Sequence, residues 1–294
     1  MVPDTETKLV GVIGWPIEHS LSPAMQGAAL REMGLNWVYL AFAVEPERVG
    51  EALDGVRGLG LVGLNVTIPH KSAVIEHLDE IDESVAALGV ANTIVRTREG
   101  RLEGHNTDGP GFLRSLAEHG HEVDGKAVTL IGGGGSARSV AYACARDGAS
   151  RMAIVNRTVE RAESVAELVH EKTGLADVEA IGLDTPAAEE AVAGADVIVD
   201  CTSVGMYPEH EVEPVTPGAW LRPGQVVVDL TYNPIDTVLL KAAREAGAAI
   251  VDGAGMLVHQ GAISLRYWSG QEPPVETMRK ALLSELGVEN QASG

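Results

Sequence analysis

A glycine-rich segment in the middle of the chain has the spacing of a phosphate-binding turn. It reads Leu130-Ile-Gly-Gly-Gly-Gly-Ser-Ala137, and Gly132, Gly134 and Ala137 form a Gly-x-Gly-x-x-Ala pattern. The segment follows a strand predicted over Ala127–Ile131 and opens a predicted helix, which is the context that a dinucleotide fingerprint requires. Gly132 would allow the tight turn, Gly134 would let the backbone approach a pyrophosphate, and Ala137 would let the helix pack on the strand. The N–H groups at the helix N-terminus favour a phosphate there.

Two arginines follow the next predicted strand, Met152–Asn156. An NAD site usually offers an acidic side chain at this place for the ribose 2′-hydroxyl. Here Arg157 and Arg161 stand one helical turn apart, and two guanidinium groups suit a 2′-phosphate. Thr158 adds a hydroxyl donor or caps the following helix. The pattern predicts NADP as the cofactor, against the alternative that both arginines are solvated surface charges.

Several polar residues in the N-terminal part of the chain stand at the ends of predicted strands. The carboxyl ends of parallel strands meet at one edge of a sheet, where ligands bind. Hydroxyls, an amide, an amine and a carboxylate that converge there would suit a small polyhydroxylated anion, with Lys71 as proton donor and Asp108 as proton relay. Each residue also has a simpler interpretation by itself, such as Ser22 as a helix N-cap. The residues concerned are Ser20, Ser22, Thr67, Lys71, Asn92 and Asp108.

Short β-branched runs alternate with helical patterns along most of the chain, which predicts an α/β fold with parallel strands and helices on both faces. Strands are expected at Lys8–Gly14, Val38–Val44, Leu61–Thr67, Asn92–Thr97, Ala127–Ile131, Met152–Asn156, Val197–Cys201, Gln225–Leu230 and Ala248–Val251. Helices are expected at Ser22–Met33, Ser136–Arg146, Val159–His170 and Thr237–Glu245. A hairpin turn is expected at Thr97–Arg101, a surface loop at Glu209–Pro217 and a frayed tail at Glu289–Gly294.

The composition narrows the class of protein. A length of 294 residues suggests about two domains, and a hydrophobic content of 45% can form a sizeable core. The net charge of −20 argues against nucleic acid as a partner. The chain has 6 Lys and 16 Arg beside this acidic excess. Such a composition is equally consistent with adaptation to high salt and with an ordinary acidic cytosolic protein.

The chain also lacks the signals of membrane or secreted proteins. No apolar run reaches the roughly 18 residues of a membrane span, and the first residues lack the basic region of a secretory signal. Cys144 and Cys201 are too few for a disulfide framework, so we expect a cytoplasmic location. The histidines lack the spacing of metal ligands, and no metal is expected.

The motifs together resemble those of the shikimate dehydrogenases almost from end to end. Such enzymes reversibly reduce 3-dehydroshikimate to shikimate with NADPH, on the route to the aromatic amino acids. The resemblance implies an N-terminal α/β substrate domain and a Rossmann-like dinucleotide-binding domain. Besides the glycine-rich turn, the matching segments are Ser20-Leu-Ser-Pro23, Asn65-Val-Thr-Ile-Pro-His-Lys71, Ala91-Asn-Thr93, Gly104-His-Asn-Thr-Asp108, Asn156-Arg-Thr158, Thr202-Ser-Val-Gly-Met206, Asp229-Leu-Thr-Tyr-Asn-Pro234 and Asp252-Gly-Ala-Gly-Met-Leu-Val-His-Gln260.

The resemblance also implies a role for each site residue. Lys71 and Asp108 would be the catalytic pair beside the carbonyl that becomes a hydroxyl. The substrate would be held at its carboxylate by Ser20, Ser22 and Tyr232, and at its ring hydroxyls by Thr67, Asn92 and Gln260. The pyrophosphate would be held by Gly132, Gly134, Gly135, Ser136 and Ala137, the adenosine phosphate by Asn156, Arg157, Thr158 and Arg161, and the nicotinamide side would be lined by Thr202, Val204, Gly253 and Met256.

Two places depart from the family pattern. Gly133 and Ser136 replace two alanines that are common in the glycine-rich turn, and both are small enough to keep the turn able to bind phosphate. Asp200-Cys201 stands where the family commonly has Asn-Ala before Thr202. A catalytic role for the Cys201 thiol is not expected, because no activating cation stands close to it in the sequence.

We therefore expect residues 1–108 to bind substrate, residues 109–252 to form the NADP domain, and residues 253–294 to pack back on the first domain as helices. The closest alternative is a quinate/shikimate dehydrogenase that uses NAD or NADP. A second is a non-catalytic NADP-binding sensor, which would not need the pair of Lys71 and Asp108. A small-molecule substrate is the expected partner, without nucleic acid or membrane, and a homodimer is the candidate assembly.

Overall fold

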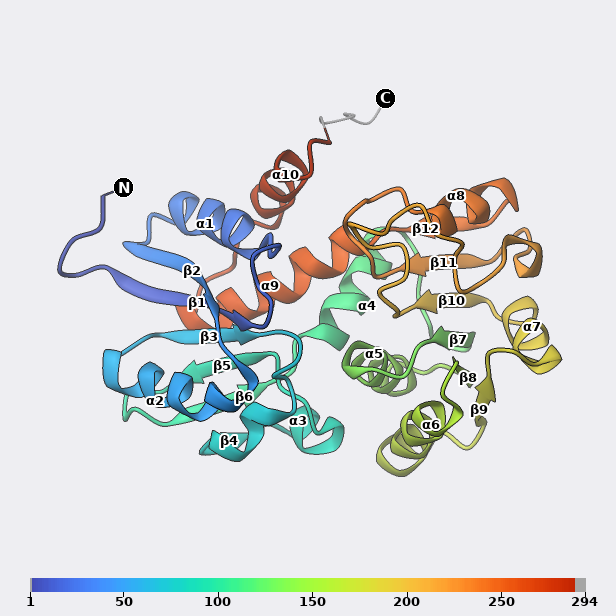
Figure 1. Ribbon diagram of the computed structural model, residues 1–294, viewed down its shortest axis with the longest axis horizontal. Helices are drawn as coiled ribbons and strands as arrows, with labels where there is room; N and C mark the ends of the chain where they lie inside the picture. Colours follow the sequence, from blue (N-terminus) through green and yellow to red (C-terminus); the bar gives the residue numbers. More distant parts are fainter. Residues whose placement is uncertain (1, 289–294) are drawn as a thin grey trace. The chain divides into compact units, whose positions relative to one another are not determined.

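The computed structural model describes residues 2–288, which form two compact units. The chain up to Thr107, together with the chain from Val258 onward, forms the first unit, and Asp108–Leu257 form the second. Each unit is built around a six-stranded sheet (Figure 1). No helix within the described residues is long and apolar enough to cross a membrane.

The sheet of the first unit is mixed, with the strand order β2-β1-β3-β5-β6-β4. Its strands are β1 (Lys8–Gly14), β2 (Trp37–Ala43), β3 (Gly63–Val66), β4 (Glu80–Ile81), β5 (Thr93–Arg96) and β6 (Leu102–His105). The parallel arrangement expected for the strand ends holds for β1, β2 and β3, but it is wrong for β5, which runs antiparallel to both of its neighbours. The predicted hairpin accounts for the pairing with β6: the Thr97 amide donates to the Arg101 carbonyl at 2.8 Å and reverses the chain.

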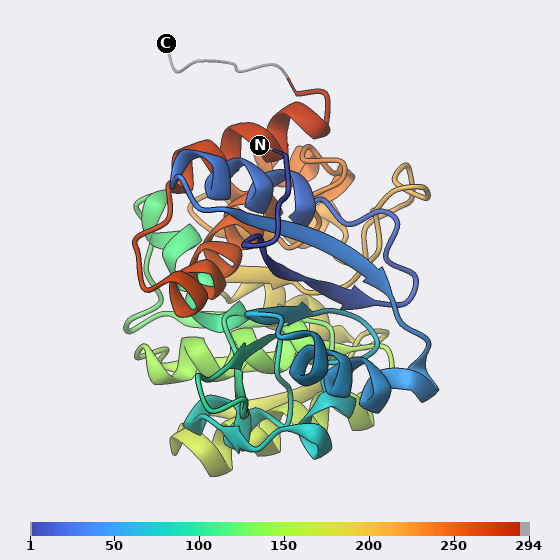
Figure 2. The same ribbon diagram turned by 90° about the vertical axis from the view of Figure 1, so that its left-hand side faces the viewer.

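Helices cover both faces of this sheet. They are α1 (Ser22–Glu32), α2 (Val49–Leu59), α3 (Glu83–Leu88), α9 (Gly253–Ser269, from Val258 onward in this unit), α10 (Val275–Glu285) and the 3-10 helices η1 (Pro46–Arg48) and η2 (Ala73–His77). On one face, Leu53 and Val56 of α2 are buried with Ile13 and Leu64 of the sheet. On the other face, Trp268 of α9 donates its indole N–H to the Ile94 carbonyl at 3.0 Å. Helix α10 lies beside α1 (Figures 1 and 2).

The sheet of the second unit is wholly parallel, which confirms the repeated βα pattern. Its order is β12-β11-β10-β7-β8-β9. The strands are β7 (Ala127–Ile131), β8 (Arg151–Asn156), β9 (Val178–Gly182), β10 (Val197–Asp200), β11 (Val226–Asp229) and β12 (Ala249–Val251). The strand order reverses at β7, because β8 and β9 lie on one side of it and β10, β11 and β12 lie on the other. In open α/β sheets ligands bind at the carboxyl ends of the two strands that flank such a reversal, here β7 and β10.

The helices of this unit also lie on both faces of its sheet (Figure 1). They are α4 (Asp108–Glu118), α5 (Gly135–Arg146), α6 (Val159–Thr173), α7 (Pro186–Ala193), α8 (Val238–Glu245) and the 3-10 helix η3 (Gly218–Trp220). Val192 of α7 and Leu239 of α8 share one buried core with Ile198 and Val227 of the sheet. On the other face α5 contacts β7, and α6 contacts β8 and β9.

The predicted element bounds agree with the structure to within a few residues, and two strands, Lys8–Gly14 and Ala127–Ile131, match it. Ser22 as an N-cap is wrong: it is the first residue of α1, Leu21 precedes it, and no side chain caps the helix. Pro23, with its fixed φ and missing N–H, starts this helix without a cap. The loop at Glu209–Pro217 has no regular secondary structure, as expected, and Glu289–Gly294 lie outside the described residues.

Two buried carboxyl groups lie side by side in the second sheet. Asp200 ends β10 and Asp229 ends β11, and the two are direct partners in the parallel register. They are 3% and 2% exposed. Because alternate residues of a strand face the same side, both point to the face of Ile198 and Val227, which α8 covers. Burial, together with the charge of Asp229, raises the pKa of Asp200 to about 7, although hydrogen bonds from Thr202 act in the opposite direction.

This pair predicts a pH-dependent stability. Between its ordinary pKa of 3.8 and about 7, the Asp200 carboxyl keeps its proton in the folded protein and releases it in the unfolded chain. The free energy of unfolding should therefore fall as the pH rises through this window and level off above it. In Asp200→Asn this dependence is absent, so the ratio of the wild-type to the variant unfolding constant should rise by up to about tenfold per pH unit.

Urea unfolding followed by circular dichroism measures this ratio. Asp184→Asn is the matched control, because it makes the same chemical change at an exposed position of the same unit. Curves for the wild type and Asp200→Asn that stay parallel between pH 4 and pH 7 would contradict a buried, protonated Asp200.

Candidate active site

A buried network of hydrogen bonds joins the sheet of the first unit to α9. The side-chain N–H group of Asn65, at β3, donates to the Ser264 hydroxyl at 2.9 Å and to the Thr93 hydroxyl at 3.2 Å. The Asn65 amide oxygen accepts from the Tyr39 hydroxyl at 2.8 Å. Ser264 in turn donates to the carbonyl of Gln260, one helical turn earlier. The network therefore fixes the part of α9 that carries Gln260 against strands β2, β3 and β5.

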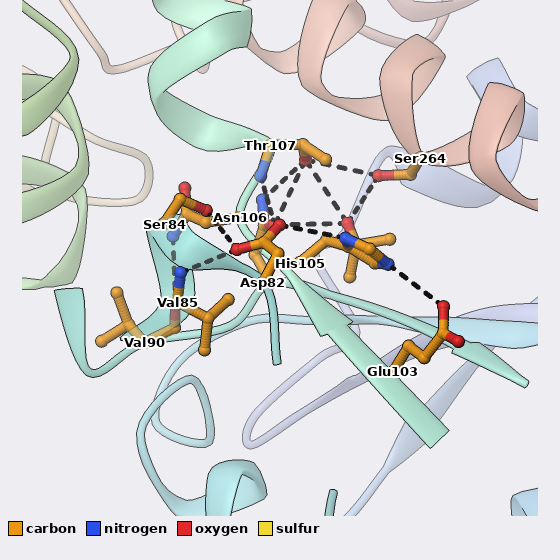
Figure 3. Close-up of polar contacts among 11 residues, drawn as sticks. Asp82, Ser84, Val85, Val90, Glu103, His105, Asn106, Thr107 and Ser264 are labelled. Carbon is orange, nitrogen blue, oxygen red and sulfur yellow. Dashed lines mark hydrogen bonds and ion pairs between the residues drawn. The ribbon is translucent and has the colours of Figure 1, made fainter. Parts of the chain in front are cut away.

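Asn92 holds the segment that leads into Asp108. The Asn92 side chain is buried; its oxygen accepts from the Thr107 amide at 2.8 Å, and its N–H group donates to the Thr107 hydroxyl at 2.9 Å. The Thr107 and Ser264 hydroxyls lie 3.3 Å apart, which joins this contact to the network (Figure 3). Asp108 follows Thr107 directly and is the first residue of α4, where it is 5% exposed.

The turn after β3 places Lys71 beside Asn92. The Thr67 amide donates to the Ile13 carbonyl at 2.9 Å, and the Lys71 carbonyl accepts from the amide of Ala91 at 2.8 Å. His70 is buried and donates its Nε2–H to the Val44 carbonyl at 2.7 Å. This bond ties the turn to the residue that follows β2. The backbones of Lys71 and of the residue before Asn92 are thus hydrogen-bonded neighbours.

Ser20 and Ser22 lie at the start of α1. The Ser22 amide donates to the Ser20 hydroxyl at 3.4 Å. The Ser22 side chain also forms a hydrogen bond with the Tyr39 phenol. Burial raises the pKa of this phenol, and the hydrogen bond with Ser22 acts in the opposite direction. Tyr39 is the donor to Asn65, so Ser22 belongs to the same polar region as Asn92 and Gln260.

A second polar cluster supports the strand that leads to Asp108. His105, the last residue of β6, makes a 3.0 Å contact from Nδ1 to an Asp82 oxygen (Figure 3). Its ring stacks on that of Tyr267, with 4.3 Å between the ring centroids. Asp82 also caps α3 by accepting from the Val85 amide at 2.8 Å. Burial opposes ionisation of Asp82, but hydrogen bonds from His105, Ser84 and Val85 prevail and lower its pKa.

In the second unit, the glycine-rich turn has room for a ligand. Gly132 has a φ of +119°, which favours glycine, and its amide donates to the Val155 carbonyl at 2.8 Å. A Cβ at Gly134 would meet no atom within 4 Å. Helix α5 begins at Gly135, followed by the half-buried Ser136, and no side chain caps its N-terminus. Ala137 is fully buried, so the helix packs closely on the sheet. This open, uncapped turn fits a pyrophosphate.

The predicted phosphate-binding residues lie at the turn between β8 and α6. The Asn156 side chain donates to the Thr158 carbonyl at 2.8 Å and fixes this turn. Thr158 precedes α6 without capping it through its side chain. Arg157 and Arg161 are exposed, and within residues 2–288 neither has an acidic partner. Two unpaired guanidinium groups beside the glycine-rich turn fit the 2′-phosphate of NADP.

The predicted nicotinamide side is formed by two neighbouring strand ends. After β10, the Val204 amide donates to the Thr202 hydroxyl at 3.2 Å. Gly253, the first residue of α9, lies against the residues that follow β11: a Cβ there would lie 2.5 Å from the Leu230 and Thr231 carbonyl oxygens, so only glycine allows this approach. Tyr232 follows Thr231, and burial raises the pKa of its phenol. Met256, one turn into α9, is buried.

Neither thiol chemistry nor a metal site stands out in the described residues. Burial raises the pKa of the Cys201 thiol well above its ordinary value, and the charge of Asp200 adds to this effect. A thiolate is therefore disfavoured at neutral pH. Residues 2–288 contain no group of three or more His, Cys, Asp or Glu side chains that could hold a metal ion.

Sequence reasoning missed several residues that build these sites. Asn65 and Thr107 belong to motifs quoted above, so a signal existed for them, but nothing in the sequence marked Tyr39 or Ser264. The structure connects Ser22, Lys71, Asn92 and Gln260 within the first unit, and it groups the glycine-rich turn, the two arginines and the residues after β10 and β11 within the second.

The chain matches known protein families along most of its length. The chain matches the family models for the shikimate dehydrogenase substrate binding domain over residues 12–94, for shikimate / quinate 5-dehydrogenase over residues 115–236, and for the shikimate 5'-dehydrogenase C-terminal domain over residues 253–283. It is 50% identical to shikimate dehydrogenase (NADP(+)) of Methanopyrus kandleri over 96% of this chain and 97% of that protein.

Solved structures give the same result. A crystal structure of a shikimate dehydrogenase in complex with NADP+ is similar with a TM-score of 0.91 and 42% identity, covering 97% of this chain and 98% of the other. A quinate dehydrogenase from Corynebacterium glutamicum in complex with NAD is similar with a TM-score of 0.88 and 34% identity, covering 95% and 99%. The chain therefore belongs to the shikimate dehydrogenase family of NADP-dependent oxidoreductases.

Proposed function

We propose that this protein catalyses the reversible reduction of 3-dehydroshikimate to shikimate with NADPH, the first unit binding the substrate and the second the cofactor. The observation that carries the proposal is the hydrogen-bonded neighbourhood of Lys71 and Asn92, with Asp108 following the Thr107 that Asn92 holds. An amine, an amide and a carboxylate carried by neighbouring backbone segments are the groups that a carbonyl reduction on a polar ring needs.

Each substrate-binding residue takes the part that its chemistry suits. The hydroxyls of Ser20 and Ser22 and the phenol of Tyr232 donate to the substrate carboxylate. The hydroxyl of Thr67 and the amides of Asn92 and Gln260 bind ring hydroxyls. The buried network behind Asn92 and Gln260 supports this role, because it holds the Asn92 side chain through the Thr107 amide and the Gln260 backbone through the Ser264 hydroxyl.

Bound NADPH supplies the hydride for the carbonyl carbon. As the carbonyl oxygen gains negative charge, the Lys71 ammonium stabilises it and donates the proton that completes the hydroxyl. Asp108 orients this ammonium and relays a proton to it. The glycine-rich turn binds the pyrophosphate through its backbone N–H groups, and Arg157 and Arg161 bind the 2′-phosphate.

We propose a cytoplasmic location, which two free cysteines support. We propose a homodimer, which the edge strand β2 and the half-exposed Leu40 and Trp15 support as surfaces for a second copy. Quinate is the alternative substrate, and the similarity of the chain to a quinate dehydrogenase is the reason to test it.

The proposed reaction is tested by following NADPH absorbance. We expect consumption with 3-dehydroshikimate, and formation of NADPH from NADP+ with shikimate. Faster turnover with 3-dehydroquinate or quinate would mean that the protein is a quinate dehydrogenase instead. Absence of turnover with all four substrates, in a protein that still binds NADP, would favour the non-catalytic sensor.

Lys71 and Asp108 should act on turnover as one unit. Removing a positioned acid or base usually costs about 10²–10⁴ in rate, so Lys71→Ala should lower turnover by this order and change substrate binding only a few fold. Asp108→Ala should lower turnover as well. Because paired groups are not additive, the double variant should be little slower than the slower single variant.

Turnover of the four proteins at saturating NADPH and substrate is the measurement. Lys126→Ala is the control, because it removes an exposed lysine of the second unit. Near-normal turnover of Lys71→Ala with a raised Michaelis constant would make Lys71 a binding residue and refute the proton donor assigned above.

Arg157 should discriminate between the two cofactors. A charge-assisted hydrogen bond contributes about 1.5–3 kcal/mol, so Arg157→Ala should raise the Michaelis constant for NADP about tenfold or more and leave that for NAD nearly unchanged. Arg146→Ala, an exposed arginine at the far end of α5, is the control. An equal loss for both cofactors would mean that Arg157 does not read the 2′-phosphate.

A further inference from the structure

Asp200 stands where the family commonly has asparagine, and the proposed reaction gives it no role. Its side chain is buried beside Asp229, its direct partner in the register of β10 and β11. Two buried carboxyls side by side resist double ionisation, because burial and like charge both oppose the second charge. The charge at position 200 therefore depends on pH in this chain, whereas an asparagine there would be neutral at any pH.

The Asp200 carboxyl lies beneath the loop that is proposed to line the nicotinamide. It accepts the Thr202 amide at 2.8 Å, and Thr202 is the first of the residues assigned to that loop. Between them, Cys201 donates its amide to the Ile131 carbonyl at 2.8 Å. A Cβ at Gly132 would lie 3.4 Å from the Cys201 carbonyl carbon. Asp200 therefore ends a strand that borders both the glycine-rich turn and the nicotinamide loop.

Along the sheet, Asp229 is the titratable group whose charge acts on Asp200. The partner of Asp200 on the other side, in β7, is the apolar Ile131. In the loop after β10, burial raises the pKa of the Cys201 thiol well above its ordinary value, so this thiol is neutral at physiological pH. The sheet therefore offers Asp200 a second acid and no cation.

The helices over this face do not neutralise the pair either. The Thr237 hydroxyl, which caps α8, donates to Asp229 at 2.7 Å. The basic residues of α8, Lys241 and Arg244, pair instead with Asp236, whose side chain is half-exposed. The charged residues of α7, Glu189 and Glu190, are exposed. The buried residues of α7 and α8 in this core are apolar: Ala188, Val192, Leu239, Leu240 and Ala243.

The nicotinamide ring is the part of the cofactor whose charge changes in the reaction, because it is positive in NADP+ and neutral in NADPH. We propose that Asp200 is a specificity-determining residue which, when ionised, selectively strengthens the binding of the oxidised cofactor. A buried charge attracts a nearby cation more strongly than the same charge in water does. This inference rests on the proposed cofactor site. It concerns oxidised against reduced cofactor, and not NADP against NAD.

The selectivity should change with pH in a defined direction. Burial, together with the charge of Asp229, raises the pKa of Asp200 to about 7, so the carboxyl is mostly neutral at pH 6 and mostly ionised at pH 8. The ratio of the dissociation constant of NADP+ to that of NADPH should therefore fall about three- to tenfold between pH 6 and pH 8. Effects common to both cofactors, such as protonation of the 2′-phosphate, cancel in this ratio.

Calorimetric titration with NADP+ and with NADPH at pH 6, 7 and 8 measures this ratio without any turnover. In Asp200→Asn we expect it to stay constant within about twofold, and at pH 8 only NADP+ should bind more weakly than it does to the wild type. Asp184→Asn, which makes the same change at an exposed position of the same unit, is the control and should behave as the wild type.

Proton release gives a second measurement that needs only the wild type. Binding and protonation are linked reciprocally, so NADP+ should lower the pKa of Asp200 and expel part of its proton. At pH 7, titrations in buffers of different ionisation enthalpy should show that NADP+ releases about 0.25–0.4 proton more than NADPH does. The difference should vanish in Asp200→Asn and persist in Asp184→Asn.

The two measurements separate the possible failures. A wild-type ratio that stays constant between pH 6 and pH 8, or equal proton release by both cofactors, would refute the proposal. The same pH dependence in Asp200→Asn would assign it to another group and refute the proposal as well. A wild-type protein that binds neither dinucleotide would instead refute the proposed cofactor site itself.

Discussion

The buried amide of Asn65 is the interaction on which the first unit depends. A buried amide must satisfy its hydrogen-bonding groups, and Asn65 does so with Tyr39 of β2, Thr93 of β5 and Ser264 of α9. These partners are far apart in the sequence, so the network forms only when the sheet and α9 are assembled. The same bonds bring together Ser22, Asn92 and Gln260, the residues proposed to hold the substrate. Folding and construction of the substrate site are therefore one event in this unit.

The second unit depends instead on the close approach of backbone segments at glycine residues. Gly132 and Gly253 bring their turns against neighbouring strand ends, and Gly133 brings the first turn against α6. These turns follow β11, β10, β7 and β8, which are consecutive strands of the sheet, so the proposed dinucleotide site would lie along one edge of that sheet.

The neighbouring carboxyls of Asp200 and Asp229, at the ends of β10 and β11, are buried beneath the loops of this site. Each accepts the amide of the residue two positions on, and so begins the loop that carries Thr202 or Tyr232. Because both are buried on one face of the sheet, burial raises the pKa of both, and one of them keeps its proton near neutral pH. Loop geometry at the site is therefore coupled to protonation of the core beneath it.

Local signals in the sequence sufficed to predict the βα order of the second unit, the strand Ala127–Ile131, the glycine-rich turn and the two arginines, because each depends on residues within a few positions of one another. The hairpin was predicted from its turn residues, but the antiparallel pairing of β5 with β3, on the side where Asn92 lies beside Lys71, was not. The partners of Asn65, the neighbouring carboxyls of β10 and β11, and the contact between Gly133 and Arg161 were decided only by the tertiary structure. Each joins segments that are distant in the sequence, and burial and steric exclusion act on such contacts only after the chain has folded.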